Sequence, residues 1–228
     1  MSELRARGLS VSYGDLLALH PLDLALAPGR MVSVTGPSGA GKSSLLWALA
    51  GALEPTAGEV RLGETRLTDR QQCAALGVVL MPQGNGLASS LTAAENVVVP
   101  LLALGVEAAE AHRRTAAALA QVGLEESGNH LIEELSGGQQ QRIALARALA
   151  AHADVLLADE PTSDLDAANR ERAMAALRAE ADRGAVVVVA THDAEAAAQT
   201  DAELHLDEGV ASWRRALDLD QALDPGDQ

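Results

Sequence analysis

The chain has 228 residues and a formal net charge of −15, with 48% hydrophobic residues but only 1% aromatic ones. This length and hydrophobic content suffice for one large domain with a full core, in which Ala, Leu and Val must supply the apolar volume because Phe is absent. The negative charge repels nucleic-acid phosphates and anionic lipids, so the composition argues against binding to either through bulk charge.

The apolar segments predict a chain that does not span a membrane. The first ten residues lack the apolar core that a signal peptide needs. No run approaches ~18 continuous apolar residues, and the most apolar one, residues 97–106, is interrupted by Pro100 and Gly105. The single Cys73 rules out an internal disulfide and fits a reducing compartment. We therefore expect a cytoplasmic protein that reaches a membrane only through another chain.

The first thirty residues predict an antiparallel β layer. Apolar and polar residues alternate in "GLSVSYG" and in "HPLDLALAPGRM", and the Pro28-Gly29 pair is typical of a turn. Tyr13, the only Tyr, ends the first pattern, where its ring could stack on an adenine base. Taken alone, Tyr13 fits a plain packing role better.

The rest of the chain alternates short β-branched runs with Ala- and Leu-rich segments. The runs are continuously apolar, which is typical of strands buried on both faces of a parallel sheet; they cover residues 31–35, 77–81, 155–159 and 185–191. The expected helices cover roughly residues 41–53, 108–122, 138–150 and 167–181. This alternation predicts an α/β fold.

Two regions fall outside that simple alternation. Residues from about 84 to 150 are mostly helical and lie between two core strands, so we expect an inserted α-helical subdomain. The chain after Gly209 is acidic, and we expect it to fray. We treat residues 211–228 as a C-terminal tail, separate from the preceding domain.

Residues 36–43, "GPSGAGKS", follow an apolar strand and precede a helix. They match the phosphate-binding pattern G-x-x-x-x-G-K-S/T, in which glycines let backbone N–H groups turn toward the β-phosphate and the helix adds its positive end. Lys42 can reach the β- and γ-phosphates, and the Ser43 hydroxyl can bind Mg²⁺. The pattern predicts an ATP site formed by Gly36, Pro37, Ser38, Gly39, Ala40, Gly41, Lys42, Ser43 and Ser44.

Three later strand ends carry polar side chains. Gln83 follows "GVVLMP" and offers an amide to Mg²⁺ and water. In "VLLADE", Asp159 is placed to hold Mg²⁺, whereas Glu160 points elsewhere and could be the general base. His192 follows the last strand, where ligands of open α/β sheets bind, and could contact the γ-phosphate. Each residue alone could be structural, but together with Lys42 they indicate catalysis of ATP hydrolysis.

A second glycine-rich helix start occurs at residues 134–149, "ELSGGQQQRIALARAL". Glycines before a helix N-terminus usually mark a place where an anion approaches the backbone. Since the phosphate loop already serves one nucleotide, this second start needs a different explanation.

Taken together, these motifs resemble the nucleotide-binding subunit of an ABC (ATP-binding cassette) transporter. The similarity covers about residues 3 to 210 and contains, in the family's order, Tyr13 of the A-loop, "GPSGAGKS" as Walker A, Gln83 of the Q-loop, "LSGGQ" as the signature, "VLLADE" as Walker B, "SDLD" as the D-loop and His192 of the H-loop. The Walker motifs fit many P-loop proteins, and "LSGGQ" makes the resemblance specific. It implies a P-loop NTPase (RecA-like) core within an ATPase domain at residues 1–210.

The resemblance also implies a head-to-tail dimer that sandwiches two ATP molecules, each between Walker A of one subunit and the signature of the other. The residues that would face the partner's ATP are Ser136, Gly137, Gly138, Gln139 and, carrying information between the sites, Asp166. ATP would then close the homo- or heterodimer, and hydrolysis would release it.

The function so implied is an ATPase subunit that powers a separate transmembrane permease from the inner face of the membrane. "LTAAENVVVPLLALG", residues 91–105, resembles the ATPases of lipoprotein-release and macrolide-export systems. A soluble or regulatory ABC ATPase, and a transmembrane signalling ATPase that moves no substrate, stay open as alternatives. A small-molecule kinase would leave "LSGGQ" without a task.

Overall fold

The centre of the fold is a six-stranded sheet in the strand order β10-β9-β3-β8-β7-β6. The computed structural model describes residues 2–216. The strand bounds are β3 (Met31–Thr35), β6 (Val78–Met81), β7 (Val155–Asp159), β8 (Val186–Ala190), β9 (Ala202–Asp207) and β10 (Val210–Arg215). The first five pair in parallel, and β10 runs antiparallel to β9. The four predicted core strands and the α/β class are thus confirmed.

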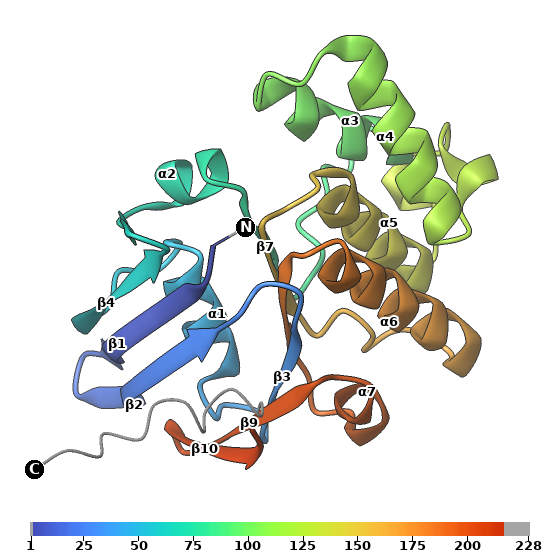
Figure 1. Ribbon diagram of the computed structural model, residues 1–228. Helices are drawn as coiled ribbons and strands as arrows, with labels where there is room; N and C mark the ends of the chain where they lie inside the picture. Colours follow the sequence, from blue (N-terminus) through green and yellow to red (C-terminus); the bar gives the residue numbers. More distant parts are fainter. Residues whose placement is uncertain (1, 217–228) are drawn as a thin grey trace, which may run out of the picture.

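Helices cover one face of this sheet, and a second sheet covers the other with one helix between the two sheets, as Figure 1 shows. Val187 and Val189 of β8 belong to the core formed with α5 (Gly137–Ala150) and α6 (Ala167–Asp182). Val186 and Val188 belong to the core formed with α1 (Lys42–Leu49). Alternate residues of a strand point to opposite faces, so a strand covered on both sides needs apolar residues throughout.

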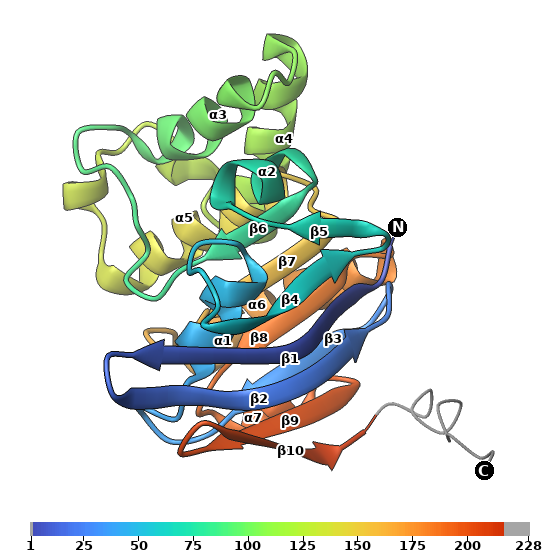
Figure 2. The ribbon, with the colours of Figure 1, turned by 90° about the vertical axis from the view of Figure 1, so that its left-hand side faces the viewer.

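The second sheet is antiparallel, with the order β2-β1-β4-β5. In Figure 2 it lies at the front of the molecule. The bounds are β1 (Leu4–Tyr13), β2 (Leu16–Leu26), β4 (Ala57–Leu62) and β5 (Thr65–Leu67). The predicted layer is confirmed, but we did not predict β4 and β5. In these strands the buried residues Val60, Leu62 and Leu67 alternate with or adjoin charged residues. The segments are short, and the charged residues make the strand pattern difficult to recognise in the sequence.

Three of the four expected helices are confirmed to within a residue, and the first ends earlier than expected. Helix α1 stops at Leu49, because Gly51 adopts φ +64° and a Cβ there would lie 2.7 Å from the Cys73 sulfur. A glycine in this conformation is a common helix terminator. The shorter helices α2 (Arg70–Ala75) and α7 (Ala194–Ala198) complete the core.

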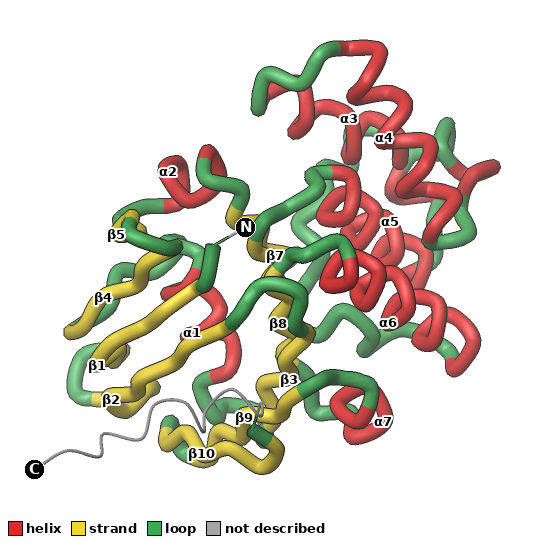
Figure 3. The backbone as a smooth tube through the Cα atoms, viewed as in Figure 1, coloured by secondary structure: helices red, strands yellow, loops and turns green. Residues whose placement is uncertain are grey.

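Helices α3 (Ala93–Ala103) and α4 (Ala108–Gln121) lie at one end of the molecule, beside α5 (Figure 3). Two 3₁₀ turns, Glu125–Ser127 and Ile132–Glu134, lead from α4 into α5. Since α5 packs on β6 and α6 as well as on α3 and α4, it joins the helical region to the core. The division of residues 1–210 into a core and an inserted subdomain stays a prediction. Within residues 2–216 no helix has the length and apolar character that crossing a membrane requires.

The expectation that the chain frays after Gly209 is wrong for residues 210–215. These residues form β10, which pairs with β9, and Trp213 packs on the core between the sheets. Arg215 donates hydrogen bonds to the carbonyl oxygens of Ala197 and Thr200, both at 2.9 Å. The remaining tail, from residue 217 on, lies outside the described residues.

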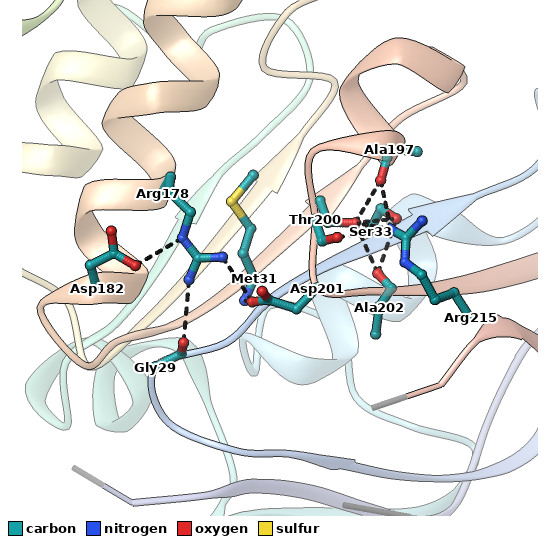
Figure 4. A network of polar contacts seen from close by, with 10 residues as sticks. All are labelled: Gly29, Met31, Ser33, Arg178, Asp182, Ala197, Thr200, Asp201, Ala202 and Arg215. Carbon is teal, nitrogen blue, oxygen red and sulfur yellow. Dashed lines mark hydrogen bonds and ion pairs between the residues drawn. The ribbon is translucent and has the colours of Figure 1, made fainter. Parts of the chain in front are cut away.

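A polar network holds the start of β3, the strand that leads into the phosphate loop (Figure 4). The Asp201 carboxylate accepts hydrogen bonds from the backbone N–H of Met31 at 2.7 Å and from Arg178 at 2.8 Å. The Asp201 backbone N–H donates in turn to the Met31 carbonyl oxygen. Arg178 also reaches Asp182 on its own helix at 3.0 Å. Asp201 therefore ties β3 to the turn before β9 and to α6.

Replacing Asp201 by Ala tests this role. We expect the free energy of unfolding to fall by about 1–3 kcal/mol, because the buried Met31 N–H loses its acceptor. Asp182→Ala is the matched control: its side chain is 69% exposed, against 26% for Asp201, although it pairs with the same arginine. An exposed pair should contribute less than about 1 kcal/mol. Equal losses in urea denaturation would contradict the assignment.

Candidate functional site

A cavity of about 550 Å³ opens where the parallel strands end. It brings together the loop after β3, the segments after β6, β7 and β8, and the first hairpin. Its lining residues are Tyr13, Leu16, Ala18, Ser38, Gly39, Gly41, Lys42, Ser43, Ser44, Gln83, Asp159, Glu160, Ser163 and His192. Gly36, Pro37 and Ala40, also predicted from the loop motif, do not line it. The sequence reasoning missed Leu16, Ala18 and Ser163.

The shape of the phosphate loop depends on glycine at two positions. Gly36 has φ +144°, and a Cβ there would lie 2.2 Å from the Leu206 carbonyl oxygen. Gly41 has φ +99°, and its Cβ would lie 2.4 Å from the Ala18 carbonyl oxygen. Each contact is with backbone, so no larger residue fits without moving a strand. The β2 and β9 backbones thus fix where the loop turns.

Lys42 closes the loop on itself. Its ammonium group, which is nearly buried, donates hydrogen bonds to the carbonyl oxygens of Gly36 at 2.8 Å and Pro37 at 3.0 Å. A positive charge is therefore held within a loop that begins a helix, and both features attract phosphate.

Tyr13 stands at the mouth of the cavity. Its hydroxyl lies 3.2 Å from the Ser44 hydroxyl, so the hairpin is connected to the first turn of α1. Tyr13 and Leu16 are both largely exposed on this side. Together with Ala18 they give the mouth an apolar wall, suited to a flat aromatic group. Leu16 and Ala18 follow the turn after Tyr13 in the sequence, and this closeness to Tyr13 could have indicated that they line the same cavity.

Asp159 is a buried carboxylate without a partner. It is 1% exposed, and among the described residues neither of its side-chain oxygens has a hydrogen-bond partner. Burial raises the pKa of Asp159 above its ordinary value; the charge of Glu160 acts in the same direction, and Ser43 and Lys42 act against it. An unpaired buried carboxylate is costly unless a cation faces it. With the Ser43 hydroxyl and the Gln83 amide in the same cavity, these oxygen donors fit Mg²⁺, whose other ligands are water and phosphate.

Glu160 is arranged as a base with an orienting partner. One carboxylate oxygen lies 2.9 Å from His192 Nδ1, and the other is buried without a hydrogen-bond partner among the described residues. The residue has φ +51°, a strained conformation for a side chain other than glycine. Such strain is usual where structure is held for function. Glu160 lines the cavity, and a carboxylate in such a place can accept a proton from water.

The segment that carries Gln83 is fastened to α5. The guanidinium group of Arg147 donates to the carbonyl oxygens of Asn85 at 2.6 Å and Gly86 at 2.7 Å. Burial lowers the pKa of Arg147. Gln83 itself is exposed to the cavity. The position of Gln83 thus depends on a helix that belongs to another motif.

The second glycine-rich start lies away from this cavity. Ser136 caps α5: the Gln139 N–H donates to the Ser136 hydroxyl, and the Gln139 side chain accepts from the Ser136 N–H at 2.9 Å. Ser136 and Gly137 are exposed, and a Cβ on Gly137 would meet nothing within 4 Å. Asp166, also exposed, caps α6 through Asn169. As far as residues 2–216 define the cavity, neither of these helix starts lines it.

Gln141 is a further polar residue that the sequence reasoning missed. It is 3% exposed, and its amide contacts Glu160, Ser163 and Asp164. The signal was a glutamine among the apolar residues of the inner face of a helix, four residues before Leu145.

Comparisons with known proteins agree with this geometry. A family model described as "ABC transporter" matches residues 19–163. The lipoprotein-releasing system ATP-binding protein LolD of Maricaulis maris is 46% identical, over 86% of this chain and 88% of that protein. The macrolide export ATP-binding/permease protein MacB 2 of Aeromonas hydrophila is 37% identical over 86% of this chain but 31% of that protein.

The solved structures agree as well. The dimeric structure of MJ0796, described as a bacterial ABC transporter cassette, has a TM-score of 0.86 and 32% identity, over 94% of this chain and 100% of that one. A second structure of MJ0796, a post-hydrolysis state bound to ADP and Pi, has a TM-score of 0.84 and 31% identity over the same shares.

The unpaired Asp159 leads to a stability prediction. A raised folded-state pKa means that the carboxyl stabilises the fold below its unfolded pKa and loses this contribution as the pH rises through the folded pKa. At pH 7, Asp159→Asn should therefore raise the free energy of unfolding of the nucleotide-free protein, by roughly 0.5–2 kcal/mol, while abolishing ATP hydrolysis. Asp15→Asn, in the exposed turn after β1, removes the same charge and controls for the net charge of −15. An equal or lower midpoint for Asp159→Asn in thermal unfolding would contradict the prediction.

Proposed function

The chain belongs to the ABC transporter family of ATP-binding proteins and is an ATPase, and from this premise we propose how its own residues bind and hydrolyse ATP and what the hydrolysis drives. The observation that carries the proposal is the position of Glu160. Its carboxylate, oriented by His192, lies in one cavity with Lys42 and the phosphate loop.

In this proposal the base of the nucleotide packs against Tyr13 and Leu16, and its phosphates lie against the phosphate loop. Residues Gly36 to Ser44 bind the phosphates through backbone N–H groups and the Lys42 ammonium group. Ser43, Gln83 and Asp159 hold Mg²⁺, which neutralises phosphate charge when it is bound. Lys42 and Asp159 are buried, and this setting strengthens their electrostatic contacts.

Glu160 acts as the general base. Its carboxylate lines the cavity and would accept the proton of a water molecule directed at the γ-phosphate. His192 holds the carboxylate in place, and its largely exposed ring is free to reach the phosphate from the other side.

We propose that the second half of each site comes from a partner subunit. Ser136, Gly137, Gly138 and Gln139 form a helix start that lies away from this chain's own cavity, with Ser136 and Gly137 exposed. A helix N-terminus attracts anions, and in a head-to-tail dimer this one would meet the γ-phosphate bound by the partner. The dimeric structure of the related MJ0796 supports such an assembly. Asp166, at the next exposed helix start, would pass the state of one site to the other.

ATP-dependent closure of this dimer would power a separate transmembrane permease, from the cytoplasmic face of the membrane. MacB 2, by its name, joins an ATP-binding part and a permease, and this chain matches 31% of that protein. The related LolD belongs, by name, to a lipoprotein-releasing system. These relatives support an export or release system over the soluble alternatives.

Glu160→Gln is the central test of this proposal. The variant should bind ATP, hydrolyse it roughly 100- to 10,000-fold more slowly, and accumulate a closed dimer, because closure persists until hydrolysis. Size-exclusion chromatography with ATP and Mg²⁺ measures the dimer, and phosphate release measures the rate. Glu64→Gln, in the turn between β4 and β5, removes the same charge as a control.

The same trapped variant tests the membrane role. Purified by an affinity tag from its own cells in mild detergent, it should bring a polytopic membrane protein with it. A monomer in ATP would contradict the sandwich, whereas a dimer without a membrane partner would favour the soluble class.

Ser136→Arg tests whether Ser136 contacts the ATP bound by its own subunit or the ATP bound by the partner subunit. The variant should bind ATP with nearly unchanged affinity, because Ser136 does not line this chain's cavity. Hydrolysis and dimer formation should be lost, because a long cation would occupy the place of the partner's phosphate. Ser212→Arg on the exposed side of β10 is the control. Loss of ATP binding by the Ser136→Arg monomer would place this residue in its own nucleotide site.

A further inference from the structure

We infer that Gln141 is a positioning residue that fixes the general base Glu160 to the signature helix α5. Through this bond the helix that meets the partner's ATP also sets the place of this chain's own base. The inference rests on the proposed roles of Glu160 and Ser136, and it assigns a role to a residue outside the seven motifs.

The amide of Gln141 is fully engaged. Its Nε2 donates to the Glu160 carbonyl oxygen at 2.6 Å and to the Ser163 hydroxyl at 3.2 Å. Its Oε1 accepts from the backbone N–H of Asp164 at 2.8 Å. A buried side-chain amide whose donors and acceptor are all paired holds its neighbours in one arrangement. One side chain therefore connects α5 to both the end of β7 and the following loop.

The bond reaches Glu160 where its conformation is most demanding. Glu160 has φ +51°, and its backbone N–H donates to the Ala190 carbonyl oxygen of β8 at 2.9 Å. The Glu160 carbonyl oxygen then faces Gln141 on the other side. The peptide groups before and after the Glu160 Cα are thus held separately, one by the sheet and one by α5. The direction of the carboxylate toward the cavity depends on both.

Close packing between α5 and the same loop strengthens this connection. A Cβ on Gly138 would lie 2.9 Å from the Asp164 carbonyl oxygen. The start of α5 is therefore pressed against the backbone of the loop that runs from Glu160 to Asp166. A glycine at position 138 is therefore required for the packing of α5 against Asp164. This requirement is separate from the proposed contact of Gly138 with the partner's ATP.

The connection is short enough to transmit small shifts. Gln141 lies five positions after Ser136, roughly 7.5 Å along a helix axis. Helix α5 is buried around most of its circumference after its first turn, with Ile143 and Leu145 both fully buried. When α5 closes on the partner's ATP, the displacement moves Gln141 and hence the Glu160 carbonyl. Each subunit would align its base only while its own signature is engaged.

The neighbouring glutamine serves another purpose, which makes it a matched comparison. Gln140 Nε2 donates to the carbonyl oxygens of Ile132 at 3.0 Å and Leu135 at 2.9 Å. It supports the turn that precedes the signature and makes no bond to Glu160. The same substitution removes two hydrogen bonds at position 140, neither of them to Glu160. At position 141 it removes three, one of them to Glu160.

The test compares Gln141→Met with Gln140→Met, which keep side-chain length and helix propensity. For Gln141→Met we expect kcat for ATP hydrolysis to fall roughly 100-fold, since a misplacement of about 1 Å at a reacting group can cost that much. The KM for ATP should stay within about twofold, because nothing in the phosphate loop changes. In the Glu160→Gln background, Gln141→Met should still form the ATP-dependent dimer. For Gln140→Met, turnover and dimer formation should change together.

The outcomes separate this inference from the proposed function. If Gln141→Met keeps more than a third of the wild-type kcat, or if its turnover falls only in step with ATP-dependent dimer formation, as expected for Gln140→Met, Gln141 does not position the base. That result would leave the Glu160→Gln and Ser136→Arg predictions untouched. If Gln141→Met yields no folded protein, Gln141→Asn, whose shorter amide cannot span Glu160 and Asp164, is measured in the same way with the same criteria.

Discussion

The parallel pairing of β3, β8 and β7 is the constraint on which the site depends. Val34 pairs with Ala190, and Ala190 with Asp159, so the three strands end at one level. Parallel strands have their carboxyl ends at the same edge of a sheet, and the loops that follow them must meet there. The phosphate loop, the Glu160 carboxylate and His192 are neighbours for this reason, although 156 positions separate Gly36 from His192. Burial of both sheet faces by apolar residues makes the pairing stable enough to hold them.

That stability supports features that cost free energy. Asp159 and Glu160 are buried carboxylates with oxygens that no described residue satisfies, and Glu160 has a left-handed backbone. Unpaired buried charge and backbone strain each oppose folding by a few kcal/mol at most sites. Their concentration at one edge of the sheet marks it as the place where the fold has been shaped for binding cations and phosphate. A well-packed core on either side of the sheet offsets the cost.

Polar side chains outside the motifs found in the sequence connect distant segments to this edge. Asp201 fastens the start of β3, Arg147 fastens the segment after Gln83 to α5, and Gln141 fastens α5 to Glu160. Two of the three lie on α5. The helix that begins after Ser136 is therefore in contact with both the Gln83 segment and Glu160. Its N-terminal part is linked to the chain's own cavity through a few hydrogen bonds.

The amino-acid sequence by itself determined the fold class, the core strands and most lining residues of the cavity, because these depend on local patterns. Continuous apolar runs identify strands buried on both faces, and the loop at residues 36–43 is defined by glycines whose conformations no other residue adopts. Tertiary structure alone decided the rest. The strands β4 and β10, the anchoring role of Arg215, and the contacts of Gln141 and Leu16 depend on partners far away in the sequence. A glutamine or a leucine has no local sign of its partner, because burial and hydrogen bonding become defined only when distant segments pack together.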